Sequence, residues 1–362
     1  MTVKKNLLRV MPWGDLPRPT RSTDAASVAD VTGCAAGSAD AARSDAARAD
    51  SSALSGVLLV DKPADVTSHD VVGAVRRLAG TRKVGHAGTL DPMATGLLTL
   101  GIGAGTRLLT YMSGHDKTYQ ATIRFGAATR TDDAQGEVIV ESLGVRPDFS
   151  VEQLDAAMAR FVGPIMQRPA SVSAIKIAGE RAYARVRAGE EVVLPERPVT
   201  VYRFARRSDP RAAAIYQLGR PMAPAIDVDV EVRCSAGTYV RALARDLGEA
   251  LGMGAHLTAL RRTHVGAFSI DEAHSIPNMA ERVRAREPLP IIPLAQAAVR
   301  IMEPIAVTAE QAAALRHGQF INLGVQKERY PVALLTHGSP AQLVAIGKAR
   351  GQLTAPATVF PA

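Results

Sequence analysis

Residues 85–96, GHAGTLDPMATG, place a single carboxylate, Asp91, in a turn made almost entirely of small residues. The glycines let the backbone adopt conformations closed to other residues, and Pro92 fixes the chain directly after the acid. An Asp-Pro pair is also an ordinary turn initiator, so the pair alone does not separate a structural turn from a reactive one. The small residues around it favour a carboxylate that is held in place and open to a bulky ligand.

The residues before this turn predict a strand and then a helix. The strand is the apolar run at residues 57–60, and a proline-broken loop leads from it to Thr67 or Ser68, either of which can begin a helix. Apolar residues recur at helical spacing, two arginines occupy the last turn, and Gly80 follows the end. A short strand and a capped helix therefore deliver the chain to the turn.

Two later segments, residues 117–126 and 227–234, alternate apolar and polar side chains, as half-buried strands do. Tyr119 begins the first on its apolar face, a position typical of an aromatic residue at the edge of a core. The second leads into a helix expected at residues 239–251, where Arg241 lies off the apolar stripe, as solvated arginines do.

Composition divides the chain into three expected parts. Residues 1–55 are rich in Ala, Ser, Asp and Arg and have no regular apolar period, which predicts a disordered tail with Trp13 in water. Residues 56–300 are long enough for a catalytic domain. In residues 301–362 we expect a small β module: Thr308 and Gln311 form a possible capping box, and short strands follow at residues 332–335 and 343–346.

Charge and cysteine content narrow the function classes. The net charge of +8 suits a polyanionic partner, although it does not require one. Cys34 and Cys234 form neither a disulfide framework nor a zinc pattern, so no metal is expected. No apolar stretch approaches the roughly 18 residues of a membrane span, and no signal peptide is evident. These features predict a cytoplasmic protein without a membrane partner.

Six motifs, in this order, resemble the bacterial TruB family of tRNA pseudouridine synthases, over residues 56 to about 268. They are VLLVDKP, TSHDVV, KVGHAGTLDPMATGLL, KTYQATIRFG, SAIK and CSAGTYVRALARDLG. The resemblance implies an α+β pseudouridine synthase fold with a central mixed, largely antiparallel sheet and flanking helices, and a C-terminal module of PUA type. It implies an isomerase that converts uridine to pseudouridine at position 55 in the T-arm of tRNA, without a cofactor and without an obligatory protein partner.

The resemblance also assigns roles to residues. Asp91 is implied as the catalytic acid, Tyr119 as the aromatic residue that faces the target base, and Arg241 as the partner of the aspartate. A flipped uridine leaves a gap in the stacked RNA, and His86 is the candidate to fill it, although a histidine in such a loop is also an ordinary turn residue. The other implied substrate-binding residues are Lys62, Lys83, Lys176, Tyr239, Leu260 and Arg261, with Arg262 beside them.

The sequence leaves several alternatives open. Asp91 could attack the sugar or the base, or could remove the 2′ proton on the way to a glycal. Two alternative functions stay open. The protein could be a guide-RNA-dependent relative that acts on ribosomal RNA, or a tRNA-folding chaperone with incidental modification. The chain departs from the family pattern at Asp65, where glycine is usual, at Arg130, at Ala170, and in a longer segment at residues 206–224.

Overall fold

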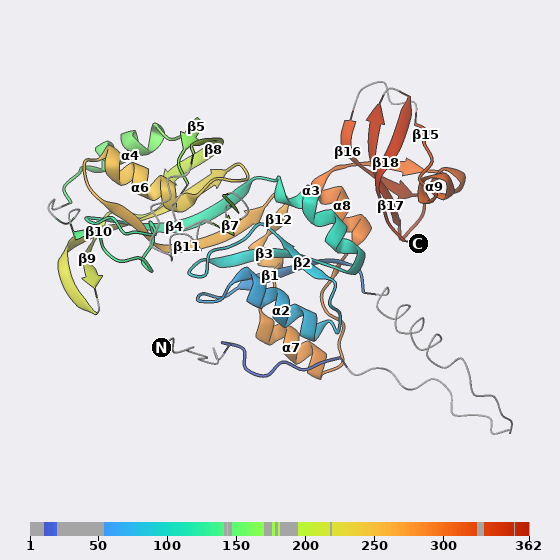
Figure 1. Cartoon of the computed structure of the whole chain (residues 1–362), viewed down its shortest axis with the longest axis horizontal. Coiled ribbons are helices and arrows are strands. Elements are labelled where there is room, and N and C mark those ends of the chain that lie inside the picture. The colour runs from blue at the N-terminus through green and yellow to red at the C-terminus, as the bar shows by residue number, and fades with distance from the viewer. Residues whose placement is uncertain are drawn as a thin grey trace. The chain divides into compact units, whose positions relative to one another are not determined.

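The computed structural model describes residues 11–19, 54–140, 143, 147–169, 176–177, 180–181, 195–217, 219–323, 329–350 and 352–361. The chain divides into two compact units. The first unit comprises Met1–Pro92, Leu97–Ser113 and Ile270–Ala362, and the second comprises Met93–Gly96 and Gly114–Ser269. Figure 1 shows the elements of both units, and each unit is described by itself.

The first unit contains a small sheet in the order β13-β1-β3, with β2 antiparallel to β3. Its strands are β1 (Gly56–Lys62), β2 (Val84–Ala87), β13 (Ile292–Pro293) and the part of β3 (Thr95–Ile102) that follows Gly96. Its helices are α2 (Ser68–Leu78), α3 (Leu109–Ser113), α7 (Ile276–Arg284) and α8 (Leu294–Ile301), with 3₁₀ turns at Gly103–Leu108 and Ile270–Glu272. Helices α2 and α7 lie side by side (Figure 1).

Helix α2 confirms the prediction made from its capping and spacing. Thr67 is the N-cap, and its side chain and that of Asp70 form a reciprocal capping box. Arg76 and Arg77 occupy the last turn, where positive charge is favourable, and Gly80 follows with φ of 62°. The apolar face is buried, so local signals and packing agree on the same helix: its buried apolar residues are Val71, Val72, Ala74, Val75 and Leu78.

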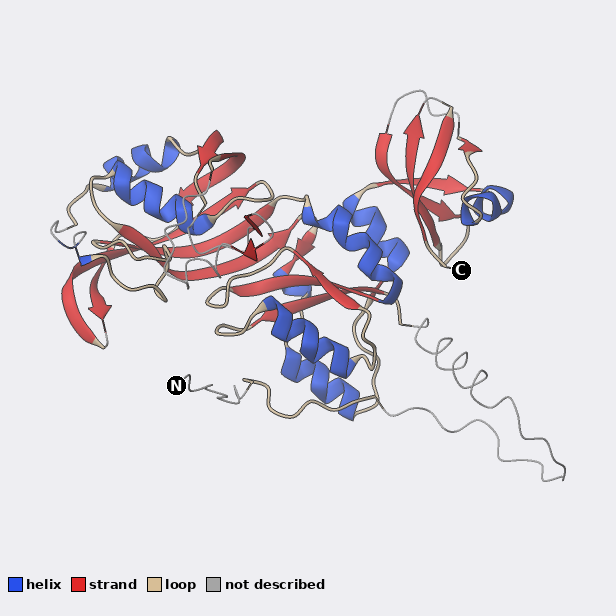
Figure 2. Cartoon of the chain, in the orientation of Figure 1, coloured by secondary structure: helices blue, strands red, loops and turns tan. Residues whose placement is uncertain are grey.

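The second unit is built on an antiparallel sheet in the order β11-β4-β10-β8-β5. The strands are β4 (Lys117–Phe125), β5 (Gly163–Gln167), β8 (Arg197–Arg206), β10 (Arg220–Cys234) and β11 (Ala255–Val265), with β9 (Arg211–Gln217) on β10 and β12 (Phe268–Ser269) on β11. Thr95 and Gly96 pair in parallel with β11, so the ladder is mixed but largely antiparallel, as expected. Helices α4 (Val151–Ala159) and α6 (Val240–Ala250) pack on strands of this sheet (Figure 2).

The alternating segments are strands, as predicted. Exposure alternates along β4, and Tyr119, Ala121, Ile123 and Phe125 are all buried. Strand β10 is longer than expected because it extends back to Arg220 and forms a hairpin with β9. The segment at residues 206–224, which the sequence marks as irregular, is therefore mainly this hairpin.

The C-terminal part of the first unit is a five-stranded sheet in the order β14-β16-β17-β18-β15. Its elements are β14 (Glu303–Val307), α9 (Ala309–Arg316), β15 (Ile321–Asn322), β16 (Arg329–Thr336), β17 (Leu343–Arg350) and β18 (Leu353–Val359). The expected capping box of Thr308 and Gln311 and both expected strands are present. Three further strands were not predicted, because they are short or irregular in pattern. The likeness to a PUA-type barrel stays a prediction.

The expected disorder of residues 1–55 is wrong for the part that the structure describes. Residues 11–19 pack on the first unit: Leu16 is 6% exposed and Trp13 is only partly exposed. Composition over the whole tail hides this short apolar segment, in which three prolines restrict the chain. The remainder of the expected tail up to residue 53 lies outside the described residues.

Candidate active site

Asp91 lies in the turn between β2 and β3, and the residue before it is held by helix α2. The main-chain N–H of Leu90 donates to Ser68 Oγ at 2.9 Å, and Ser68 Oγ donates back to the Leu90 carbonyl at 3.2 Å. Both side chains are buried, Leu90 at 3% exposure and Ser68 at 2%. The backbone that enters Asp91 is therefore fixed by the first residue of a well-capped helix.

The residue after the acid is held as well. The Pro92 carbonyl accepts from Lys62 Nζ at 3.1 Å and from the Asp65 main-chain N–H at 2.8 Å. Asp65 has φ of 62°, a left-handed conformation in which aspartate is tolerated and glycine is favoured, which accounts for the departure at this position. With both neighbours of Asp91 fixed, the half-buried carboxylate sits on a rigid main chain.

Lys62, one of the expected substrate-binding residues, is buried in the loops around the acid. Its side chain is fully buried, and the ammonium also donates to the carbonyls of Pro63 at 2.9 Å and Val66 at 2.7 Å. An ammonium has three protons to donate, and three main-chain carbonyls receive them here. Lys62 therefore holds together the loops around the acid.

The other two site residues of the first unit differ in exposure. His86 is half-buried on β2, opposite Leu100 of β3. Lys83 is exposed just before β2, and its carbonyl accepts from the Gly103 N–H at 2.9 Å. Lys83 is thus open to solvent, as a phosphate-binding cation has to be.

Three of the expected residues in the second unit lie on neighbouring strands. Tyr119 on β4 is 7% exposed and is the register partner of Arg262 on β11 and of Val232 on β10. Leu260 is buried at 7%, and Arg261 is half-buried with Nη1 3.5 Å from Thr95 Oγ1. The sheet brings Tyr119, Leu260 and Arg261 to the same strand pair.

Gly96 is required by a close approach of β11. A Cβ at this position would lie 2.3 Å from the Arg262 carbonyl oxygen, and its φ is 99°. Only glycine fits such a contact and such a conformation. The last glycine of the turn therefore permits the parallel pairing of β3 with β11.

Arg241 is only 4% exposed, so the interpretation of this residue as a solvated helix arginine is wrong. Its Nη1 lies 3.3 Å from Asp133 Oδ2 and donates to the Thr131 carbonyl at 2.7 Å. The two side chains are 5% and 6% exposed, so the pair is shielded from water. Asp133 is a partner of Arg241 that the sequence analysis missed, and the acidic pair in the TRTDD run after β4 was the available signal.

Asp132 forms the neighbouring ion pair, with Arg245 at 3.0 Å. Burial raises the pKa of this carboxyl to about 6, although Arg245 and Arg241 act in the opposite direction. Its φ is 59°. Two adjacent acidic residues thus bind two arginines of helix α6, which ties the loop after β4 to that helix.

Strand β4 also carries a buried lysine. Lys117, two residues before Tyr119 on the same face of β4, has its pKa lowered to about 8 by burial and then by the charge of Arg262. Its register partner Cys234 is buried, and burial raises the pKa of that thiol to about 11. The thiol is therefore protonated at neutral pH and is a poor nucleophile.

Tyr239 is the N-cap of α6, and Gln167 holds it on both sides. Its N–H donates to Gln167 Oε1 at 2.8 Å, and Gln167 Nε2 donates to the Tyr239 carbonyl at 3.0 Å. The Arg197 guanidinium lies 4.6 Å from the centre of its ring. Lys176 begins β6 (Lys176–Ile177), which pairs with β7 (Glu180–Arg181), and its side chain lies outside the described residues.

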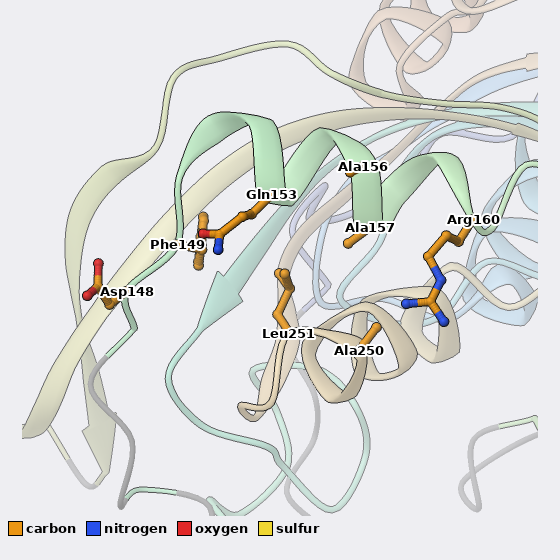
Figure 3. Close-up of a pocket in the computed structure, with 8 residues that line it drawn as sticks. All are labelled: Asp148, Phe149, Gln153, Ala156, Ala157, Arg160, Ala250 and Leu251. Carbon is orange, nitrogen blue, oxygen red and sulfur yellow. The ribbon is translucent and has the colours of Figure 1, made fainter.

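A hollow of about 400 Å³ lies between α4 and α6 (Figure 3). Alanines and Leu251 form much of its lining, with Asp148 and Arg160 as the charged residues. It contains none of the predicted site residues. Among the described residues no three His, Cys, Asp or Glu side chains are grouped to hold a metal ion, and no helix there is long and apolar enough to cross a membrane.

Comparisons with known proteins agree with this fold and these motifs. Residues 76–240 match "TruB family pseudouridylate synthase (N terminal domain)" and residues 241–288 match "tRNA pseudouridylate synthase B C-terminal domain". A "tRNA pseudouridine synthase B" of Arthrobacter sp. (strain FB24) is 53% identical over 75% of this chain and 83% of its own. That of Leifsonia xyli subsp. xyli is 48% identical over 85% of this chain and 97% of its own.

The structural likeness extends to a more distant complex. The chain resembles a protein of the archaeal box H/ACA sRNP Nop10-Cbf5 complex with a TM-score of 0.60 and 25% identity, over 84% of this chain and 86% of that one. The family match and the relatives define a pseudouridine synthase, an isomerase. Within that class, the chain belongs to the TruB family.

Proposed function

We propose that this enzyme converts uridine to pseudouridine at position 55 in the T-arm of tRNA. The observation that carries the proposal is the turn of Asp91, whose neighbours Leu90 and Pro92 are held by Ser68, Lys62 and the Asp65 main chain. The names of the relatives support tRNA as the substrate. A carboxylate with a fixed backbone is held in one position, so it can meet the same reacting atom of a flipped nucleotide in every turnover.

The reaction breaks the bond from N1 to C1′, turns the uracil within the site, and joins C5 to C1′; C5 loses its proton and N1 gains one, so the product is an isomer of the substrate. Asp91 acts as the essential carboxylate, by attack on the sugar or base or by removal of the 2′ proton. Arg241 pairs with that carboxylate and orients it, since a planar guanidinium can bind a carboxylate with two hydrogen bonds. Tyr119 faces the base, and either Tyr119 or the Asp91 carboxylate removes the C5 proton.

Binding rests on other residues of the two units. His86 fills the gap left by the flipped uridine, and Lys83 and Arg261 meet the RNA backbone. Lys176, Tyr239 and Leu260 line the substrate site. Residues 56–300 form the catalytic domain, and residues 301–362 form a PUA-like module that adds RNA contacts. The enzyme works in the cytoplasm, where its tRNA substrate is found.

The experiment measures tritium release from [5-³H]uridine-labelled tRNA by the purified protein with no cofactor and no added RNA. We expect turnover by the wild type and none by Asp91→Asn, with tRNA binding nearly unchanged because phosphate contacts supply most of the affinity. Asp148→Asn, which alters an exposed carboxylate in the hollow between α4 and α6, is the matched control and retains activity.

The same assay separates the alternatives. Turnover on free tRNA excludes a requirement for a guide RNA, whereas activity that appears only when a guide is added contradicts the proposal. If Asp91→Asn still rescues tRNA folding but the wild type modifies nothing, the protein is a chaperone. Residual turnover by Asp91→Asn within tenfold of wild type would remove Asp91 from the chemistry.

A further inference from the structure

Residues 11–19, hereafter the N-terminal segment, lie against helices α2 and α7 of the first unit. Figure 1 shows the segment in dark blue beside these helices. Leu16 is its anchor: only 6% of this side chain is exposed, although the residues on either side are polar or proline. The segment precedes the first motif of the catalytic domain by more than thirty residues, so its position is not required by chain connectivity.

Each of the two helices binds the main chain of the segment through an arginine in its last turn. Arg77 Nε of α2 donates to the Leu16 carbonyl at 2.5 Å. Arg284 Nη2 of α7 donates to the Asp15 carbonyl at 3.3 Å. Two consecutive carbonyls therefore accept hydrogen bonds from two different helices. Both donors are charged, and hydrogen bonds from charged donors are stronger than those from neutral donors.

The N-terminal segment and the surface on which it lies have matching shapes. Pro12, Pro17 and Pro19 restrict the segment, and Gly14, with φ of 61°, closes a turn in which its N–H donates to the Met11 carbonyl at 3.1 Å. A chain restricted in this way loses little conformational entropy when it binds. Opposite it, Gly80 leaves room for Pro19, whose Cγ would lie 3.0 Å from a Cβ at that position.

We propose that the surface formed by α2 and α7 is a docking site for the N-terminal segment of the same chain, and that docking stabilises the first unit. The site recognises an extended, proline-restricted peptide with one leucine anchor. Recognition rests on the buried Leu16 side chain and on the two main-chain carbonyls held by Arg77 and Arg284. The proposal is independent of the catalytic assignment, because none of these residues belongs to the proposed active site.

Trp13 reports on docking directly, because it is the only tryptophan in the chain and lies in the segment. In the full-length protein its emission should be blue-shifted and poorly quenched by acrylamide. Leu16→Asp places a charge in the buried anchor site and should shift the emission to that of tryptophan in water, raise the quenching constant severalfold and lower Tm. Arg77→Gln removes the donor to the Leu16 carbonyl on the helix side and should act in the same direction.

Arg18→Ala is the matched control, because Arg18 is an exposed residue of the same segment and should leave emission and Tm unchanged. Wild-type emission in both Leu16→Asp and Arg77→Gln, or unchanged Tm in both, would overturn the proposal. Wild-type emission that moves with protein concentration would overturn docking within one chain and indicate a second copy.

A peptide of residues 11–19 tests the surface separately. Added to the full-length Leu16→Asp, Trp13→Phe protein, it should bind saturably with a blue shift of its own tryptophan, and the peptide with Leu16→Asp should not. Equal behaviour of the two peptides would show that Leu16 is not the anchor and would contradict the proposed recognition.

Discussion

Asp133 and Arg241 form a buried ion pair in which Arg241 Nη1 lies 3.3 Å from Asp133 Oδ2. Burying two charges is costly, so such a pair is weak evidence for stability by itself. Its location carries more meaning: it fixes the guanidinium of the arginine that we propose as the partner of Asp91. A buried residue can thus act on the reaction through its neighbour.

Replacing Asp133 tests this role. Asp133→Ala should lower the free energy of unfolding by about 3–5 kcal/mol, because it leaves the Arg241 charge buried without its carboxylate. It should also reduce kcat more than it changes KM for tRNA. Asp155→Ala, which breaks the exposed pair of Arg206 and Asp155, should cost less than about 1 kcal/mol, measured by denaturant unfolding. A kcat close to wild type in Asp133→Ala would show that the pair is structural alone.

Asp132 makes stability depend on pH. Its pKa is about 6 in the folded protein against an ordinary 3.8, so its contribution to folding is full at low pH and is lost as the pH rises through about 6. Asp132→Asn keeps a residue that tolerates positive φ but removes the titration. The unfolding free energy of the variant relative to wild type should rise by up to about 3 kcal/mol between pH 4 and pH 7. A difference that stays constant with pH would contradict the raised pKa.

Among the elements, the turn between β2 and β3 shows how local and non-local forces combine. Its glycines and proline make the turn possible, but Ser68, Lys62 and the Asp65 main chain hold it in one conformation. These holding residues come from the end of β1, the loop after it and the start of α2. The strand and helix before the turn therefore position the acid.

Lys62→Met tests the holding function. Removing the ammonium takes a donor from the carbonyls of Pro63, Val66 and Pro92, of which Pro92 keeps the Asp65 N–H, and costs about 1–3 kcal/mol for each buried group left unsatisfied. We expect lower stability and lower kcat, with KM for tRNA nearly unchanged, because Lys62 is fully buried. Lys83→Met is the matched control: replacing this exposed lysine should raise KM for tRNA and leave stability unchanged. The opposite pattern, a raised KM and normal stability in Lys62→Met, would return Lys62 to the RNA-binding residues.

The whole molecule carries a net charge of +8, which matters most for the encounter with RNA. Contacts to phosphate release bound counterions, so affinity falls steeply with salt. We expect KM for tRNA to rise strongly between about 50 and about 200 mM salt while kcat changes little, as measured by tritium release at saturating and limiting tRNA. A KM that is insensitive to salt would contradict binding through the phosphate backbone.

The sequence by itself determined the elements whose signals are local. Helix α2 follows from its cap, its apolar spacing and its last-turn arginines, and β4 follows from strict alternation over nine residues. The order of the motifs likewise identified the family, because each motif is a continuous stretch. Asp91 stood out for the same reason, since the small residues around it are its neighbours in the chain.

The tertiary structure decided what depends on distant contacts. Arg241 is a buried partner of Asp133, more than a hundred residues away in the chain. Lys62 is buried with its ammonium on the carbonyl of Pro92, thirty residues away, as well as on two nearby carbonyls. Composition predicts that the N-terminal segment is disordered. In the structure Leu16 is buried, and arginines of α2 and α7 together bind the main chain around it. Local pattern sets the backbone of each element, whereas burial and ion pairing are properties of the assembled surfaces, and no single stretch of sequence contains them.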